Sequence, residues 1–132
     1  MNSETPIKKI VNTNVVFVNP TDTMAKVEEI FANVHIHHIL VLENEDLKGV
    51  ISKSDLLNLY TEYTNNNKLV NRNSTLAKDI MTPDPISLDV DDTVGLAADI
   101  FLSNKIHSIP ILNGSKLAGI ITNHDLIKFA FE

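Results

Sequence analysis

The chain has 132 residues, of which 43% are hydrophobic and 21% charged, an ordinary balance for one compact globular protein. Its formal net charge of −6 argues against general nucleic-acid binding, which needs a basic face. The absence of cysteine excludes disulfide frames, thiolate zinc sites and cysteine nucleophiles. No apolar run approaches the roughly 18 residues of a membrane span, and the N-terminal residues form no apolar signal region, so we expect a cytoplasmic protein without a membrane partner.

The first half of the chain predicts a short strand, a helix, two strands and a second helix. Apolar residues recur at helical spacing after Thr23, whose hydroxyl suits a helix start, as does the preceding Asp22. An acidic turn at residues 43–46 separates the two strands, and we interpret it as solvated. The expected elements cover residues 15–18, 23–34, 38–42, 47–52 and 53–63.

The second half predicts the same order of elements after a polar, Asn-rich segment. Residues 64–74 suit an exposed linker, and residues 75–81 suit a short helix that Pro83 and Pro85 end by residue 82. Asn113-Gly114 is a strong hairpin signal between the last two strands. The expected elements of this half cover residues 86–88, 93–104, 108–112, 117–122 and 123–131.

The two halves of the chain repeat each other. Ile36-His37 matches Ile106-His107 at an offset of 70 positions, and this register holds without a gap over about fifty residues, which indicates two copies of one β-α-β-β-α unit. Because neither copy is long enough to bury a core comfortably, we expect an α/β (α+β) fold in which the copies pack with pseudo-two-fold symmetry around ligand clefts. The expected parts of this one compact module are a first repeat at 1–64, a linker at 65–75 and a second repeat at 76–132.

The sharpest motif lies where the last strand of each copy runs into the closing helix. The two versions are Gly49-Val50-Ile51-Ser52-Lys53-Ser54-Asp55 and Gly119-Ile120-Ile121-Thr122-Asn123-His124-Asp125. As a structural feature this is a capping box, in which the aspartate accepts a hydrogen bond from the backbone of the hydroxyl residue. As a functional feature, the free N–H groups of a helix start attract phosphate, and a neighbouring carboxylate can accept hydrogen bonds from both hydroxyls of a ribose.

The duplicated unit resembles the CBS domain family, named after cystathionine β-synthase. The resemblance rests on the order of elements, on both motifs, on the lead-in Ile80-Met81-Thr82-Pro83 and on residues 104–111, and it covers almost the whole chain. Tandem pairs of these domains bind adenine nucleotides or related adenosyl ligands. The resemblance therefore implies AMP, ADP or ATP as a regulatory ligand, with S-adenosylmethionine as a further candidate, and no cofactor.

The resemblance also implies which residues hold the ligand. It assigns the ribose to Asp55 and Asp125, with Ser52 and Thr122 beside them, the adenine to Val16, Ile51, Ile86 and Ile121, and the phosphates to His37, His38 and His107. The other implied positions are Thr82 and Pro83 in the lead-in, and Asn123 and His124 inside the second motif.

The two implied sites differ in their lead-in segments. The segment before the second copy, Thr82-Pro83-Asp84-Pro85, contains two prolines, whereas Asn12-Thr13 occupies the matching place before the first copy. A stiff segment loses less entropy when a ligand binds. We therefore expect the pocket of Asp125 to be the better formed.

The histidines allow a second interpretation, a metal site. His35 and His37 are two positions apart on a strand-like segment and would share a face. A site needs three or four ligands, so His38, His107 or His124 would have to complete it. Partly buried or phosphate-facing histidines agree better with this ligand count, and we expect no metal.

We expect a regulatory module rather than an enzyme, because the chain has no recognisable nucleophile–base pair and no Gly-rich phosphate loop. Ligand binding would shift the population of conformations or the state of assembly, and the effector protein would be a separate chain. The alternative is a structural dimerisation or protein-interaction module with vestigial pockets. Apolar residues of the closing helices predict a homodimer, namely Leu59, Tyr60, Tyr63, Ile127, Ala130 and Phe131.

Overall fold

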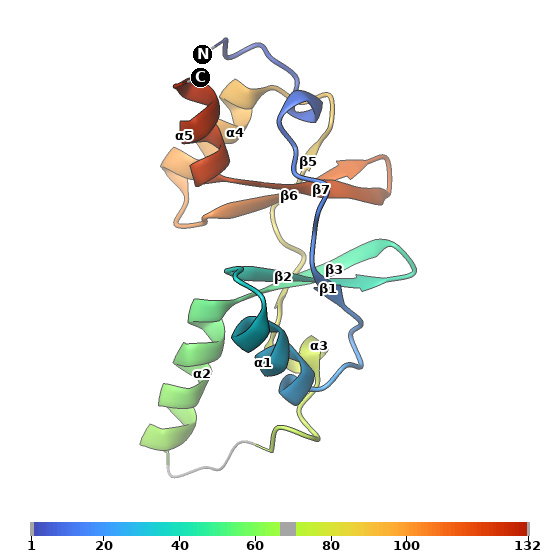
Figure 1. Cartoon of the computed structure of the whole chain (residues 1–132), viewed down its shortest axis with the longest axis vertical. Coiled ribbons are helices and arrows are strands. Elements are labelled where there is room, and N and C mark those ends of the chain that lie inside the picture. The colour runs from blue at the N-terminus through green and yellow to red at the C-terminus, as the bar shows by residue number, and fades with distance from the viewer. Residues whose placement is uncertain (1, 67–70, 132) are drawn as a thin grey trace. The chain divides into compact units, whose positions relative to one another are not determined.

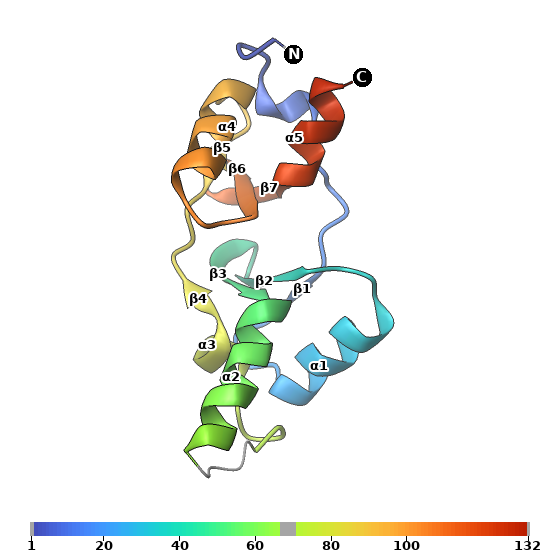
Figure 2. The same ribbon diagram turned by 90° about the vertical axis from the view of Figure 1, so that its left-hand side faces the viewer.

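The computed structural model describes residues 2–66 and 71–131, which form two compact units. Unit 1 combines the N-terminal residues up to Val15 with the residues from Pro85 onward, and unit 2 is Val16–Asp84. Within each unit, helices cover one face of a small sheet (Figure 1), as a second view also shows (Figure 2). The expected α/β fold with two copies of one unit is therefore confirmed.

Unit 2 contains the first repeat from Val16 onward and two short elements from the segment that follows the linker. Its strands lie in one sheet in the order β1 (Phe17–Val18), β2 (His38–Glu43), β3 (Asp46–Ser52) and β4 (Thr82–Pro83). β1 is parallel to β2, and the other neighbouring strands are antiparallel. Its helices are α1 (Met24–Asn33), α2 (Lys53–Asn65) and α3 (Ala77–Ile80).

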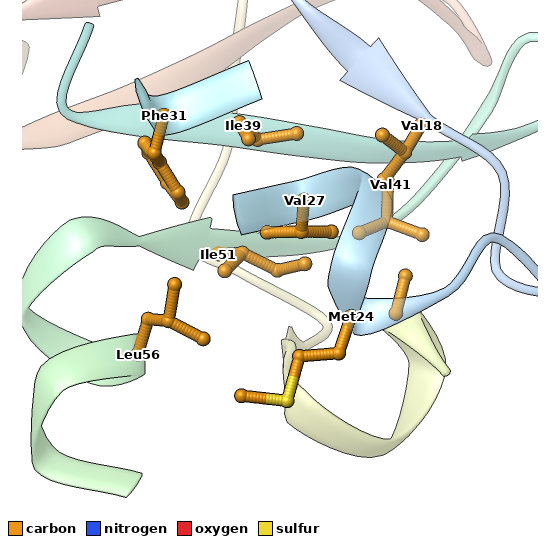
Figure 3. Close-up of a cluster of buried hydrophobic side chains, with 9 residues drawn as sticks. Val18, Met24, Val27, Phe31, Ile39, Val41, Ile51 and Leu56 are labelled. Carbon is orange, nitrogen blue, oxygen red and sulfur yellow. The ribbon is translucent and has the colours of Figure 1, made fainter. Parts of the chain in front are cut away.

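A cluster of buried hydrophobic side chains holds the helices of unit 2 on the sheet (Figure 3). Ile39 and Val41 alternate along β2 and, with Ile51 of β3, face the helices. They pack with Val27 of α1 and Leu56 of α2. Complete burial of one such side chain stabilises the fold by about 1.5–3 kcal/mol. This core therefore fixes the junction at which β3 runs into α2.

Unit 1 repeats this arrangement. Its strands are β5 (Leu88–Asp89), β6 (Ser108–Asn113) and β7 (Lys116–Thr122), its helices are α4 (Val94–Ser103) and α5 (Asn123–Ala130), and a 3₁₀ turn, η1, spans Ile7–Lys9. β6 and β7 pair in the same register as β2 and β3, since Ile109 lies opposite Ile121 as Ile39 lies opposite Ile51. The buried core of unit 1 consists of Ile7, Val94, Ala97, Ile109, Ile111, Ile121 and Leu126.

Unit 2 is completed by residues 72–84, the segment that precedes the second repeat in the sequence. The backbone N–H of Ala77 donates to the carbonyl of Asp22 at 2.7 Å, and the Ala77 side chain lies in the core of the unit. Thr82 of β4 lies opposite Val50 of β3, which adds a fourth strand to the sheet. The lead-in that the sequence places with the second repeat therefore packs on the first.

Unit 1 is completed in the same way by the N-terminal segment, residues 2–12. The N–H of Ile7 donates to the carbonyl of Asp92 at 2.8 Å, and the side chain of Ile7 has no exposed surface. Two hydrogen bonds of 3.0 Å join the backbones of Asn12 and Ile120, at the place where β4 joins β3 in unit 2. The two completing segments are thus exchanged between the repeats.

Two glycines at matching positions allow these segments to approach the sheets. A Cβ atom on Gly119 would lie 2.4 Å from the carbonyl oxygen of Asn12, and one on Gly49 would lie 2.5 Å from the sulfur of Met81 and 2.8 Å from the carbonyl oxygen of Thr82. Real Cβ atoms essentially never come so close to another heavy atom. The glycine of each motif is therefore required by the close approach of the exchanged segment.

An ion pair further attaches the completing segment of unit 2. Nε of Arg72 lies 3.0 Å from the carboxylate of Glu28 on α1, and its guanidinium carbon lies 5.7 Å from the ring centroid of Tyr60 on α2. Burial and hydrogen bonding to Glu28 raise the pKa of Tyr60, and the same carboxylate raises the pKa of Arg72. Tyr60 therefore belongs to the internal packing of unit 2.

The helices and strands lie close to their expected positions, with boundaries that shift by at most two residues. The two short elements η1 and β4 were not expected. Part of the expected linker, residues 67–70, lies outside the described residues. Among the helices of the described part of the chain, none combines the length and the apolar character that crossing a membrane needs.

Candidate functional site

The first motif forms the N-terminus of α2. The hydroxyl of Ser52 accepts a hydrogen bond of 2.9 Å from the N–H of Asp55 and caps the helix. The side chain of Asp55 is exposed, and within residues 2–66 and 71–131 its carboxylate makes no hydrogen bond. This carboxylate is thus held at the helix start with its oxygen lone pairs directed to solvent.

The second motif forms the N-terminus of α5 and is a complete capping box. The hydroxyl of Thr122 accepts from the N–H of Asp125 at 3.1 Å, and the carboxylate of Asp125 accepts from the N–H of Thr122 at 2.9 Å. Asp125 is half-buried. The second motif is therefore the capping box that the sequence predicts, and one carboxylate oxygen of Asp125 already accepts a hydrogen bond from the backbone.

The residue after each cap ties the helix to the strand beside it. The N–H of Lys53 donates to the carbonyl of His37 at 2.9 Å, and the N–H of Asn123 donates to that of His107 at 3.2 Å. In unit 1 the side chain of Asn123 also lies 3.4 Å from Nδ1 of His107 and accepts from the N–H of His124. The start of α5 thus satisfies more of its own polar groups than the start of α2, which instead carries a lysine.

The predicted adenine contacts are only partly accessible. Ile51 and Ile121 have no exposed surface and face the helices inside their own units. Because strand neighbours point to opposite faces, Val50 and Ile120 point away from those helices. The assignment of the adenine to Ile51 and Ile121 therefore does not agree with the structure, whereas Ile86 is 45% exposed. Val16 is partly buried against the core of unit 2.

The histidines lie near the motifs but form no metal site. His37 and His107 are exposed at the entrance to the second strand of their repeats, and His38 lies opposite Ser52 at the start of β2. His35 and His37 are in edge-on contact, with ring centroids 6.5 Å apart. In the part of the chain that the structure describes, no group of three or more potential metal ligands occurs.

The positions of Thr82 and Pro83 correct one expectation. Both residues are exposed and lie in unit 2, where they pair with β3 of the motif that ends in Asp55. Of the two prolines, only Pro83 lies in the sheet of unit 2, whereas Pro85 belongs to unit 1. The lead-in is therefore shared between the units and gives no reason to expect a better-formed pocket at Asp125 than at Asp55. The sequence does not reveal this placement, because the lead-in is positioned by its pairing with Gly49 and Val50, which lie far away in the sequence.

The contribution of residues 2–12 to the second motif is not predicted by the local sequence pattern. Asn12 pairs with Ile120, two residues before Thr122. The signal in the sequence was Gly119, because a glycine inside a strand often marks the close approach of another backbone.

Comparison with known proteins agrees with this architecture. The model of the CBS domain family matches the chain twice, over residues 7–62 and 77–132. The protein MJ1404 of Methanocaldococcus jannaschii is 26% identical over 134 residues, which cover 96% of this chain and 32% of that protein. The inosine-5'-monophosphate dehydrogenase of the same organism is 27% identical over 122 residues, which cover 91% of this chain and 22% of the enzyme. The chain thus spans a third or less of the length of these two relatives.

Solved structures share the fold. The crystal structure of CBSX2, an Arabidopsis thaliana protein, in complex with AMP superposes with a TM-score of 0.83 at 22% identity, over 96% of both chains. At this identity the likeness concerns the fold. Together with the two matches of the family model, which cover most of the chain, it shows that the chain belongs to the CBS domain family and carries two tandem copies of the domain.

Proposed function

We propose that this protein is a regulatory module that binds adenine nucleotides at the starts of α2 and α5. The observation that carries the proposal is the duplicated hydroxyl-x-x-aspartate motif, which forms an N-terminal cap at both helices. It is supported by membership of the CBS domain family and by a structural neighbour, CBSX2, that was solved with AMP. We also propose a cytoplasmic location, because the sequence contains no apolar signal region and no apolar run of membrane-spanning length.

Each motif supplies two features that a nucleotide needs. Backbone N–H groups at a helix start carry a partial positive charge and favour a phosphate. The carboxylates of Asp55 and Asp125 can accept hydrogen bonds from ribose hydroxyls. The exposed His37 and His107 lie immediately before β2 and β6, and their carbonyls accept the first N–H of each helix. We propose that binding shifts the population between conformations, which a separate effector protein reads.

We propose no catalytic activity for the chain. The match to the dehydrogenase covers only 22% of that enzyme, and the match to the arabinose 5-phosphate isomerase KdsD of Francisella tularensis covers 32% of that protein. The dominant feature of the chain, a pair of capped helix starts with an aspartate, suits binding rather than bond-making chemistry.

The proposal predicts thermal stabilisation by nucleotides. A ligand at about 100 times its dissociation constant adds about 2.7 kcal/mol to the free energy of unfolding. We expect at least one of AMP, ADP and ATP to raise the melting temperature in a thermal shift assay, with S-adenosylmethionine as a further ligand in the panel. Guanosine monophosphate serves as the matched control. An unchanged melting temperature with all four adenosyl compounds at saturating concentration contradicts the proposal and favours the structural alternative.

A second candidate function is a dimerisation module, which exposed apolar residues of the closing helices favour. Leu57 on α2 is 58% exposed, Ile127 on α5 is 57% exposed, and Phe131 after α5 is 85% exposed. Leu59 and Tyr60 are partly buried and pack against the core of unit 2, so they offer less apolar surface to a partner than these exposed residues. We propose that the homodimer uses the exposed residues.

Sedimentation tests this interface. We expect a dimer at micromolar concentration and a monomer for the variant Ile127→Glu/Phe131→Glu, because burying two unpaired carboxylates is costly. The control is Leu102→Glu on α4, a residue that is 86% exposed but lies outside the closing helices. A monomeric wild-type protein would contradict the homodimer.

A further inference from the structure

The N-terminal segment, residues 2–12, is part of the unit that holds the second motif. The carbonyls of Ser3 and Thr5 accept the N–H groups of Gly95 and Val94 at 2.9 and 2.8 Å, and so cap the start of α4. The side chain of Ile7 lies in the same buried cluster as residues from α4, β6, β7 and α5. The segment therefore supports the core on which α5 rests.

The same core contains the immediate neighbours of the second motif. Ile121 precedes Thr122, Leu126 follows Asp125, and both are buried with Ile7. In addition, the backbone pair of Asn12 and Ile120 ends two residues before Thr122. A displacement of the segment would thus remove packing from both sides of the capping box.

In unit 2 the same relation holds with the other segment. Ala77 lies in a buried cluster with Ile51 and Leu56, the neighbours of Ser52 and Asp55. Each motif is therefore supported by the segment that precedes the opposite repeat. As a consequence, the second motif depends on residues 2–12 for its packing, whereas the first motif depends on the segment that contains Ala77.

We propose that residues 2–12 are a positioning element for the Thr122–Asp125 motif, and that they regulate the second site while leaving the Ser52–Asp55 motif unaffected. Lifting this segment from unit 1 would remove packing from the start of α5. The outer side of the segment is accessible for such an event, because Lys8 and its ion-pair partner Asp91, 3.2 Å away, are both largely exposed. The regulatory part of this inference rests on the proposed function, whereas the positioning role can be measured without any ligand.

Amide hydrogen exchange on the ligand-free full chain tests the positioning role. Ile10 and Ile80 are matched residues of the two completing segments, and each is partly buried against the core of its unit. Ile10→Ala should speed the exchange of the Asn123 and Asp125 amides by about tenfold and leave those of Lys53 and Asp55 unchanged, because removing packing promotes local opening. Ile80→Ala should have the reverse pattern.

A second matched pair of variants keeps the test decisive if Ile10→Ala or Ile80→Ala fails to fold. Gly119→Ala places a methyl group against the carbonyl of Asn12, whereas Gly49→Ala places one against Met81. The first should loosen only the second motif and the other only the first. Exchange that rises equally at both motifs, or at neither, in the Ile10→Ala and Gly119→Ala proteins would overturn the inference.

A final arm connects the segment with the ligand. Since coupling between two sites is reciprocal, AMP at a saturating concentration should slow the exchange of the Ile7 and Asn12 amides in the Asp55→Ala protein, where only the second site is intact. If AMP binds that protein but leaves these amides unchanged, the regulatory part of the inference is wrong. If AMP does not bind the wild-type protein, the proposed function fails while the ligand-free result stands on its own.

Discussion

Replacing Ile7 with alanine is expected to lower the free energy of unfolding by about 2–5 kcal/mol, the range for truncating a fully buried Ile, Leu or Met side chain. Ile7 is a residue of the first repeat by sequence, but its side chain is completely buried in the core of unit 1, between α4 and the strands of the second repeat. The cavity left by the truncation would lie in that core. Urea denaturation followed by circular dichroism measures the change.

The control for this variant is Lys9→Ala, which alters an exposed residue of the same turn and should change stability by no more than about 0.5 kcal/mol. Amide exchange should show that the loss of protection in Ile7→Ala begins in α4, β7 and α5. A change below about 1 kcal/mol for Ile7→Ala would mean that the N-terminal segment does not pack on unit 1 in solution.

The two motif aspartates are expected to respond differently to alanine substitution. The Asp55 carboxylate has no hydrogen bond among the described residues, so Asp55→Ala breaks no hydrogen bond there and removes only the proposed ligand contacts. Hydrogen bonds to a charged group contribute about 1.5–3 kcal/mol, so AMP affinity should fall about 10- to 100-fold with little change in stability.

Asp125→Ala should have the opposite balance. The Asp125 carboxylate already accepts the N–H of Thr122, so its removal breaks a structural hydrogen bond with a net contribution of about 1 kcal/mol. Its oxygens have less capacity left for a ribose, and the loss of affinity should be the smaller of the two. Titration calorimetry and thermal melts of both variants separate these effects, with Glu62→Ala on α2 as an exposed control. A larger loss of affinity for Asp125→Ala would contradict the assigned inequality of the sites.

Local patterns were sufficient to predict most elements of this fold. Helical spacing in residues 23–34 and the turn at Asn113-Gly114 depend on neighbours within a few positions, and the offset of 70 positions doubled each signal. The caps at Ser52 and Thr122 were predicted for the same reason, because a capping box is defined by residues three positions apart.

The exchanged segments could not be predicted in this way. η1 and β4 are short and contain no strong periodicity, and what holds them is contact with residues such as Asp92 and Val50, far away in the sequence. The face of β3 was obscured for a related reason. All residues from Ile39 to Leu42 of β2 are buried, so β2 has no alternation of polar and apolar residues that identifies the face toward the helices. Because Ile51 lies opposite Ile39, its own face was not identified either, and the sequence assigned Ile51 to the ligand instead of the core.

The most direct test of the central claim is titration calorimetry of the full chain with AMP and with ATP, compared with the Asp55→Ala/Asp125→Ala protein. If the two helix starts are nucleotide sites, the wild-type protein should bind at least one of these nucleotides with a dissociation constant of roughly micromolar order, near −8 kcal/mol, and the double variant should show no binding. Equal binding by both proteins would place the nucleotide elsewhere, and the absence of binding to the wild-type protein at millimolar nucleotide would contradict the claim that this tandem CBS pair is a nucleotide sensor.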